Sequence, residues 1–195
     1  MKPKFCFFVT VTVALGALPI LAATYTTIDY PGAIYTSVNG GPSPNGDLVG
    51  IYEDTHFKVH GFVMTADGTF SSIDYPNAIS TQINGWVDPK GEIVGQFSDS
   101  SSHTHGFTLY KGTFTQVDYP NAYYTALNGV NPQGNIIGTF CVTGHCGVFT
   151  LDKKAAFHEV TVSGATLGSG ATISPTGAIR LHWRIWMETE PSISL

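Results

Sequence analysis

Apolar and polar residues alternate in short runs along most of this chain, and Pro, Gly or Asn ends most runs. Alternation with a period of two, interrupted by such residues, predicts β-strands. The clearest example predicts four successive strands, at residues 69–75, 79–83, 92–97 and 103–110. After residue 23 we find no stretch with convincing helical periodicity. The pattern therefore predicts an all-β protein.

The strand pattern repeats about every 44 residues. The aspartates of a recurring Asp-Tyr-Pro phrase are Asp29, Asp74 and Asp118, at spacings of 45 and 44 residues. A fainter fourth copy, 43 residues on, has Thr161 in place of the aspartate. Two further marks recur in step: an apolar pair followed by Gly50, Gly95 or Gly138, and a His-Gly-Phe mark at His60 and His105 that is loosened around His145. Each repeat thus contains four predicted strands.

A repeat of this length is typical of a β-propeller blade. Four strands cannot cover both faces of their own sheet, so successive units must stack. We predict an all-β, β-propeller-like array of about four four-stranded repeat units, the last one incomplete, in a single domain from residue 24 to 195. The predicted repeats lie near residues 24–68, 69–112, 113–155 and 156–195.

The last repeat is degenerate, because its tail lacks the glycine after the apolar pair and the His-Gly-Phe mark. Three explanations stay open. The tail caps the sheet edge, or an N-terminal strand at residues 24–30 completes the last unit across a ring. In the third, the tail is foreign sequence that ends a truncated, longer array, with an exposed edge prone to association.

Residues 1–23 differ from the rest of the chain. Lys2 and Lys4 precede an apolar run that ends at Ala22-Ala23, which predicts a secretory signal peptide, with an uncleaved membrane anchor as the alternative. No later stretch approaches the roughly 20 apolar residues of a membrane span. We therefore expect a secreted protein, located outside the cell, in the periplasm or at the cell surface.

The chain after this leader is acidic. It carries seven Lys and Arg against 14 Asp and Glu, a formal charge of −7, so nucleic acid is not an expected partner. With Cys6 in the leader, Cys141 and Cys146 remain as an even pair. In an oxidising compartment they predict a disulfide. The alternative, half of a metal site, lacks a second cysteine pair.

The repeated polar residues have a structural and a functional interpretation. In the structural one, the three aspartates accept hydrogen bonds from turn amides or hydroxyls, and the histidines of the second mark bridge neighbouring strands. One functional alternative is a Ca²⁺ site in a ring of the aspartates, which Thr161 breaks. The other is a zinc site at His103 and His105, with Asp99 upstream, which lacks a third protein ligand from another unit. We expect no metal and no cofactor.

IVGQFSDSSSHTHGF, from Ile93 to Phe107, and GTFTQVDYPNA, from Gly112, resemble the HAF family of extracellular repeats. The resemblance covers nearly all of the chain after the leader, and Phe97 replaces a tyrosine of the family pattern. It implies secretion and a propeller-like β-repeat fold, but no established reaction, ligand or catalytic residue. Cys141, Cys146 and the degenerate fourth unit depart from the family pattern.

Catalysis needs a nucleophile with its base, or carboxyl groups of divergent acidity, in one pocket. We find no such set unique to one unit and no Gly-x-Ser-x-Gly, so we predict no catalytic residue and no enzyme. Trp86, Tyr123 and Tyr124 are candidates for stacking against a sugar or peptide, with packing as their ordinary role. The sequence favours a binding or scaffold module for an unknown extracellular glycan or protein ligand. A polysaccharide hydrolase or lyase and a truncated propeller fragment are the alternatives.

Overall fold

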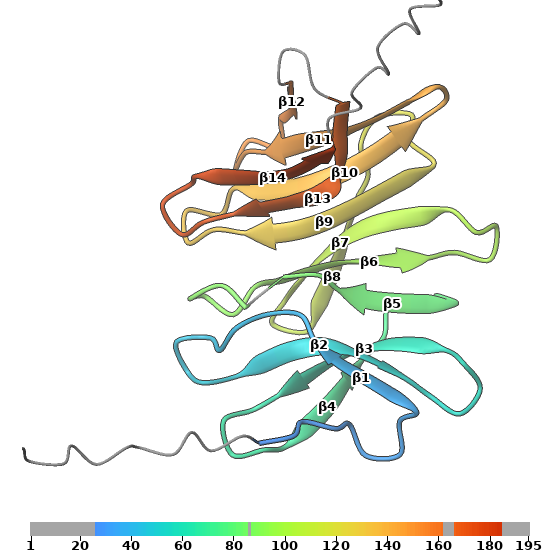
Figure 1. Cartoon of the computed structure of the whole chain (residues 1–195), viewed down its shortest axis with the longest axis vertical. Helices are drawn as coiled ribbons and strands as arrows, with labels where there is room; N and C mark the ends of the chain where they lie inside the picture. Colours follow the sequence, from blue (N-terminus) through green and yellow to red (C-terminus); the bar gives the residue numbers. More distant parts are fainter. Residues whose placement is uncertain (1–25, 86, 162–165, 185–195) are drawn as a thin grey trace, which may run out of the picture.

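The computed structural model describes residues 26–85, 87–161 and 166–184, and in these ranges it has 14 strands and no helix (Figure 1). The strands are β1 (Tyr35–Val38), β2 (Leu48–Glu53), β3 (Val59–Met64), β4 (Phe70–Ile73), β5 (Ser80–Ile83), β6 (Ile93–Ser98), β7 (Thr104–Tyr110), β8 (Thr113–Val117), β9 (Tyr124–Val130), β10 (Ile136–Val142), β11 (His145–Leu151), β12 (Phe157–Val160), β13 (Thr166–Ile173) and β14 (Ile179–Arg184). The all-β prediction is confirmed. Nothing in the described part of the chain is a helix long and apolar enough to cross a membrane. The predicted signal peptide lies outside the described residues.

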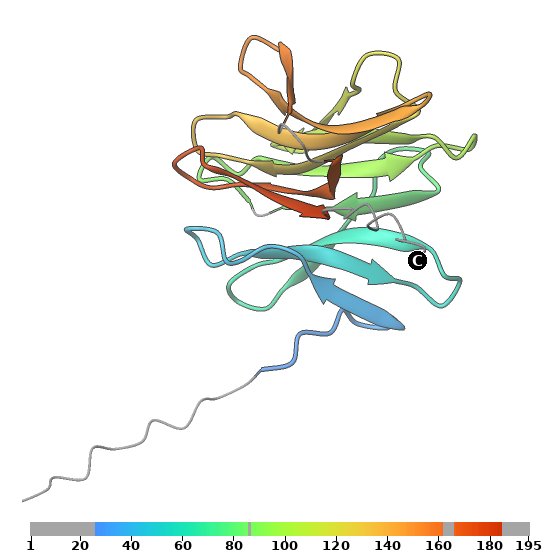
Figure 2. The same ribbon diagram turned by 45° about the horizontal axis from the view of Figure 1, so that its top comes forward.

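Strands β1–β4 form one antiparallel sheet, and β5–β12 form an eight-stranded sheet, which we describe as two antiparallel sheets of four because a single parallel bridge joins its halves. The first sheet is β1–β4, the second β5–β8 and the third β9–β12, and β13 pairs with β14 as a two-stranded fourth unit. One parallel bridge, between Thr104 and Tyr124, joins the second and third sheets. The three sheets lie one above another, and the fourth unit lies against the third sheet (Figures 1 and 2). The described residues form an open stack and no closed ring.

The sheets are offset by one strand from the repeats that we predicted. The strands before the phrases at Asp74 and Asp118 are β4 and β8, the last strands of their sheets, and β12, before Thr161 of the degenerate copy, is the last strand of the third. The phrase is conspicuous in the sequence because it marks the crossing from one sheet to the next. Residues 26–30 form no strand, so the described part of the expected N-terminal strand is not paired across a ring. Residues 180–184 of the tail pair with β13, and residues 185–195 lie outside the described part of the chain.

The crossing itself is a tight turn. At Tyr75-Pro76-Asn77-Ala78, the Ala78 N–H donates to the Tyr75 carbonyl at 3.1 Å and Asn77 has a φ of 63°. Proline followed by a residue with positive φ is the signature of a type II turn. Gly32 and Asn121 have a positive φ at the same point of the other two phrases. The phrase is therefore fixed by backbone geometry as well as by packing.

The tyrosine of each phrase packs on the sheet that follows it. Tyr75 stacks on Phe97 with ring centroids 3.6 Å apart, and its edge contacts Phe114 at 5.1 Å. Tyr30 stacks in the same way on Tyr52 at 3.7 Å, and Tyr119 on Phe140 at 3.7 Å. Stacked and edge-on rings bury large apolar areas at favourable geometry. The tyrosine of the phrase is therefore a packing residue of the following sheet.

The repeated glycines allow phenylalanine rings to lie close to the sheet. A Cβ at Gly95 would collide with the Gln82 carbonyl and would lie 2.8 Å from the ring of Phe107, which is fully buried. Gly50 and Gly138 are packed in the same way under Phe62 and Phe149. Any side chain at these positions would separate paired strands, which accounts physically for the repeated glycine.

Neighbouring sheets pack through residues of complementary size, with a small residue on one sheet facing a larger one on the next. A Cβ at Gly61 on β3 would lie 2.9 Å from the Ile83 side chain of the next sheet, and one at Gly106 on β7 would lie 2.9 Å from Leu127. The equivalent residue on β11 is Val148, which shares a buried cluster with Ala171 of β13. Glycine thus faces a large residue at two borders, and valine faces alanine at the third. This match indicates that β13 occupies the position of a true fourth inner strand.

Candidate functional site

The repeated histidines and aspartates meet at the outer side of the first two sheets. His60 Nδ1 lies 2.6 Å from Asp74 Oδ1, and His105 Nδ1 lies 3.1 Å from Asp118. The other ring nitrogen faces Asp54 in the first sheet and Asp99 in the second, each at 3.4 Å. Ser72 and Gln116 also donate to the phrase aspartates. These contacts tie β3 to β4 and β7 to β8, and so they have a structural role.

The acceptors Asp54 and Asp99 also hold the hairpin turns that they begin. Asp99 Oδ1 accepts from the N–H groups of Ser101 and His103, and these bonds, with that to the His103 N–H foremost, lower the pKa of the Asp99 carboxyl. Bonding to the charged form favours it. His103 precedes β7 and is exposed, so it lies outside the strand that carries His105.

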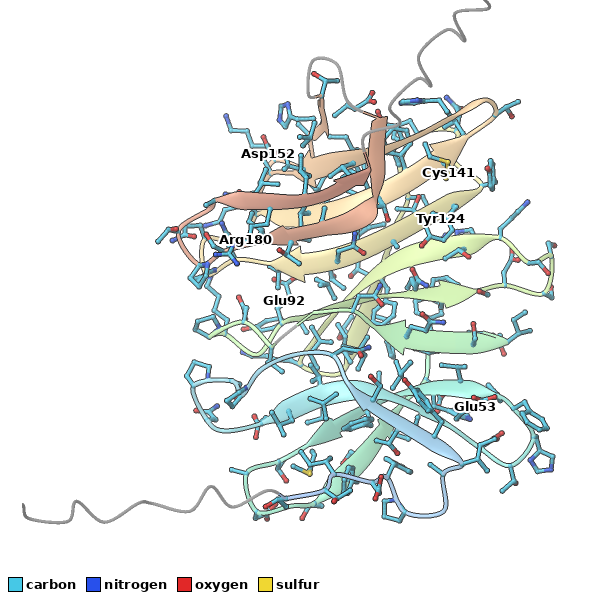
Figure 3. The ribbon with its side chains drawn as sticks, in the orientation of Figure 1. Glu53, Glu92, Tyr124, Cys141, Asp152 and Arg180 are labelled. Carbon is cyan, nitrogen blue, oxygen red and sulfur yellow. A yellow bond between two sulfur atoms is a disulfide. The ribbon has the colours of Figure 1, made fainter. Side chains whose placement is uncertain are left out.

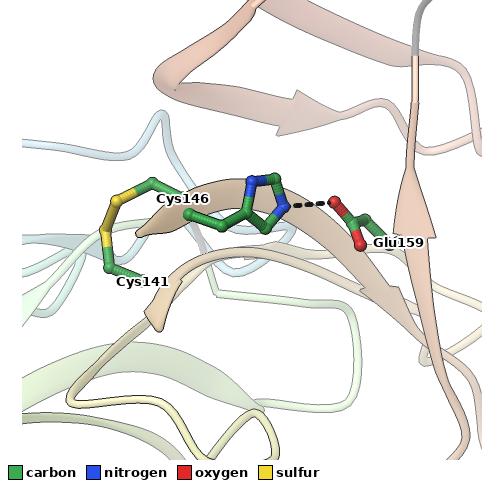
Figure 4. Close-up of a disulfide and its surroundings, with 4 residues drawn as sticks. Cys141, Cys146 and Glu159 are labelled. Atoms are coloured by element: carbon green, nitrogen blue, oxygen red, sulfur yellow. Dashed lines mark hydrogen bonds and ion pairs between the residues drawn. A yellow bond between two sulfur atoms is a disulfide. The ribbon is translucent and has the colours of Figure 1, made fainter. Parts of the chain in front are cut away.

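The third sheet departs from this arrangement. Gly147 replaces the histidine, because Phe140 pairs with Gly147 where Phe97 pairs with His105. His145 Nε2 instead lies 2.7 Å from Glu159 Oε1, beside the Cys141–Cys146 pair at the tip of the β10–β11 hairpin (Figure 4). The two sulfurs are 2.05 Å apart, as the predicted disulfide requires. A disulfide fits an oxidising compartment.

Neither metal interpretation finds support among the described residues. No group of three His, Cys, Asp or Glu side chains within them is arranged to hold a metal ion. Asp74 and Asp118 follow the outermost strands of their sheets and contact different histidines, and exposed Asp29 has no side-chain partner among the described residues. The three aspartates therefore do not form a ring around an axis.

A polar cluster without a counterpart elsewhere in the described stack lies at the border between the second and third sheets. Gln82 and Gln96 face each other across β5 and β6, and the Gln96 Nε2 donates to Gln82 Oε1 at 3.0 Å. The Tyr124 hydroxyl on β9 donates to Gln96 Oε1 at 3.2 Å. Figure 3 shows Tyr124 where the third sheet borders the second. At the border between the first and second sheets, Ser37, Ile51 and Ser80 occupy the equivalent positions.

Burial shapes the chemistry of this cluster. Burial raises the pKa of the Tyr124 hydroxyl, so the group stays protonated and acts as a hydrogen-bond donor. Gln82, Gln96 and Tyr124 are each only partly buried, which leaves polar atoms within reach of solvent. Amides offer donors and acceptors on one rigid plane. The cluster can therefore bind a ligand that is rich in hydroxyl or amide groups.

Two exposed apolar side chains immediately precede β5 and β9, strands that carry the cluster. Tyr123, next to Tyr124, is 51% exposed, as is Ile79 at the equivalent position of the second sheet. Of the three aromatic residues that we singled out, the structure thus brings Tyr123 and Tyr124 to one sheet border. Trp86 lies outside the described residues. The sequence analysis did not single out Gln82 and Gln96 as site residues. The signal that could have found them is that neither residue is repeated at the equivalent position of the other sheets.

An unusual carboxyl group lies in the turn after β5. Asp88 is 2% exposed, and its Oδ1 accepts from the N–H groups of Lys90 and Glu92. Its Oδ2 has no hydrogen-bond partner among the described residues. Burial, reinforced by the charge of Asp88, raises the pKa of Glu92. The equivalent turns begin with Ser43, Asn131 and Ser174, so this acidic pair belongs to the second sheet alone.

An open pocket of about 220 Å³ lies between the third sheet and the fourth unit. Its lining is Asn135, Thr150, Leu151, Asp152, Ile173, Gly177 and Ile179. The Asp152 carboxylate there holds its own turn through the N–H groups of Lys154 and Ala156. Asp152 is the one acid among the described residues of this lining.

Comparison with known proteins supports the fold and leaves the activity open. No family model and no curated protein matches the chain. A solved structure from Agrobacterium tumefaciens, described as TolB, is similar over 80% of this chain and 57% of its own length, with a TM-score of 0.64 and 14% identity. The chain therefore spans little more than half of that relative. At this identity the likeness shows the fold alone, and with the stacked sheets it defines this chain as a β-propeller-like repeat protein.

Proposed function

We propose that this protein is a secreted or cell-envelope binding module that recognises a glycan or peptide at the border between its second and third sheets. The observation that carries this proposal is the cluster of Gln82, Gln96 and Tyr124, with exposed Tyr123 beside it. Convergent polar groups next to an aromatic ring fix the orientation of a ligand, while the ring supplies contact area. Secretion and membership of the HAF family are parts of the same proposal.

The proposal is tested by binding to panels of envelope polysaccharides and peptides, with Tyr123→Ala and Gln96→Ala as variants. We expect each to weaken binding at least about tenfold, because each removes contact area or an orienting amide. The matched control is Tyr35→Ala, since Tyr35 is exposed at the position of the first sheet that corresponds to Tyr124. The site assignment fails if Tyr35→Ala weakens binding as much, or if the unaltered protein binds nothing in the panels.

A second candidate, a polysaccharide hydrolase or lyase, is favoured by one observation, the raised pKa of Glu92 beside buried Asp88. A carboxyl group with a raised pKa is the usual general acid of glycoside cleavage. Turnover of a polysaccharide that is lost in Glu92→Gln and kept in Gln96→Ala would establish this function and displace binding as the main one.

A further inference from the structure

The turn between the first two strands of each unit is held by one side-chain acceptor. In the second sheet, Asp88 Oδ1 accepts from the N–H groups of Lys90 and Glu92, each at 2.8 Å. The equivalent oxygens of the other turns accept from the N–H group four residues on, and they belong to the neutral residues Ser43, Asn131 and Ser174. The turn therefore needs neither the second oxygen nor the negative charge of a carboxylate.

The second oxygen of Asp88 has no partner in the part of the chain that the structure describes. Asp88 is 2% exposed, and its Oδ2 is buried without a hydrogen bond. The ion pairs among the described residues do not include Asp88 either. A buried charge in a protein is normally paired or coordinates a metal ion. Asp88 Oδ2 is therefore a candidate ligand atom.

A second carboxyl group lies beside this oxygen. Glu92 is partly buried, and burial together with the charge of Asp88 raises the pKa of its carboxyl, while exposed Lys90 has a smaller, opposite effect. Two carboxyl groups thus share a place with little access to water, and a cation between them relieves both the repulsion and the lost hydration. At the equivalent positions of the other units, the residues are Asp47, Asn135 and Ala178, each paired with a neutral turn residue.

The next unit along the chain buries this place. Where another unit follows, the first residue of the turn is 7%, 2% and 1% exposed, at Ser43, Asp88 and Asn131. Ser174, which no described unit follows, is only partly buried. Asn131 Nδ2 lies 3.8 Å from the position of a Cβ on Gly177, in the turn of the fourth unit. Asp88 Oδ2 occupies the equivalent place, so it faces the turn at residues 131–135 of the third sheet.

We infer that Asp88 and Glu92 bind a calcium ion at the border between the second and third sheets. Asp88 Oδ2 and the Glu92 carboxylate supply two oxygen ligands, and backbone carbonyl groups and water complete the coordination. Ca²⁺ accepts such a mixed, flexible set of oxygens, whereas Mg²⁺ demands strict octahedral geometry and zinc favours nitrogen and sulfur. Since two carboxylates are few, we expect a dissociation constant of about 0.1–1 mM, as in extracellular calcium-binding modules.

This site is separate from the others described above. It uses no histidine and no aspartate of the Asp-Tyr-Pro phrase, so it is neither the aspartate ring nor the zinc pair. Figure 3 shows Glu92 and Tyr124 at opposite ends of the same sheet border, so the inference does not rest on the proposed function. A bound cation keeps Glu92 ionised. Calcium binding and a general-acid role of Glu92 therefore exclude each other.

The test measures the melting temperature of the full chain in EDTA and in about 10 mM CaCl2 or MgCl2 at equal ionic strength. For a dissociation constant near 1 mM, Ca²⁺ should raise the melting temperature by about 3–6 °C, and Mg²⁺ should raise it less. Equilibrium dialysis of the unaltered protein with radioactive calcium should find a single bound ion for each chain.

Two variants remove one ligand each. Asp88→Asn should abolish the rise in melting temperature, and Asn131 shows that this turn accepts asparagine, with its Oδ1 as the acceptor. Glu92→Gln, at a residue that is only partly buried, should weaken calcium binding at least about tenfold and does not depend on how asparagine is tolerated. The matched control is Asp47→Asn, because Asp47 occupies the position of Glu92 in the first sheet and receives a hydrogen bond from the neutral Ser43.

The Asp47→Asn control should respond to Ca²⁺ as the unaltered protein does. The inference is overturned if the unaltered protein neither binds calcium nor is stabilised by it, or if Mg²⁺ stabilises it equally. A calcium response that persists in both Asp88→Asn and Glu92→Gln, or one that is lost in Asp47→Asn, would also overturn it.

Discussion

The Gly61–Ile83 contact predicts that the effect of Gly61→Ala on stability depends on residue 83. The substitution should destabilise the protein when residue 83 is isoleucine and should not when it is alanine. In the unaltered protein, Gly61→Ala would place a methyl group 2.9 Å from two carbons of Ile83 and 3.2 Å from the Ile73 carbonyl. Crowding of this kind costs about 1–3 kcal/mol. Ile83 is fully buried, so Ile83→Ala alone should cost about 3–4 kcal/mol through lost burial and a cavity.

In the double variant the new methyl group occupies part of that cavity. Alanine also restricts the unfolded chain relative to glycine, which favours folding by about 0.5–1 kcal/mol. We therefore expect Gly61→Ala to be neutral or slightly stabilising when Ile83 is alanine, a coupling of about 1–3 kcal/mol. The Val148 and Ala171 pair shows that the fold accepts this reversed arrangement at its third border.

Urea unfolding followed by circular dichroism, with slopes compared among the variants, measures the four free energies of this cycle. Gly61→Ala combined with Leu127→Ala is the control, because Leu127 packs on Gly106 at another border. Those two changes should add within about 0.5 kcal/mol. If Gly61→Ala lowers the free energy of unfolding equally with isoleucine and with alanine at position 83, residues 61 and 83 do not pack against each other and the packing argument is wrong.

Three further outcomes are expected. Tyr75→Ala removes the ring stacked 3.6 Å from Phe97 and should lower the free energy of unfolding by about 3 kcal/mol, whereas Tyr110→Ala, at an exposed tyrosine, should change it little in the same urea titration. The pKa of Asp99 is lowered in the folded protein, so its stabilising effect is present above its ordinary value of 3.8 and is lost as the pH falls through the lower folded value. The melting temperature of Asp99→Asn should therefore fall less between pH 5 and pH 2 than that of the unaltered protein. An equal fall would contradict the stabilising role of the charged Asp99 carboxylate. Replacing Cys141 and Cys146 by serine opens a loop of six residues and should cost about 2 kcal/mol, an effect that a reductant should reproduce in the unaltered protein and not in the variant.

Periodicity in the sequence was enough to predict strands, stacking and the class of fold, because each unit repeats the same local signals. It could not predict where a sheet begins. The Asp-Tyr-Pro phrase is the strongest repeat mark, and it belongs half to one sheet, through Asp74, and half to the next, through Tyr75. A mark that joins two sheets gives the repeat length and not the boundary.

The candidate site was harder to find than the fold, for a related reason. A search for repeats favours residues that recur, whereas Gln82 and Gln96 do not recur in the other sheets; Tyr124, which has a counterpart in Tyr35, was singled out only as an aromatic residue. Gln82 and Gln96 are 14 positions apart on paired strands of one sheet, whereas the Tyr124–Gln96 hydrogen bond joins residues 28 positions apart, on strands that become neighbours only when two units stack. For the phrase aspartates, the Ser72 hydroxyl donates to Asp74 as expected, but the sequence did not show that the bridging histidines His60 and His105 would be their partners.

The reciprocal sizes at the sheet borders restrict how such a chain can lengthen by gene duplication. An extra copy of the second sheet could follow the first, since a large inner-strand residue would again meet a glycine like Gly61 or Gly106. The same copy inserted after the third sheet would press an isoleucine onto Val148, where Ala171 now fits. Insertion of a further copy of the second sheet is therefore compatible with the packing before the third sheet and incompatible with it after the third sheet. The packing thus constrains the order of the units.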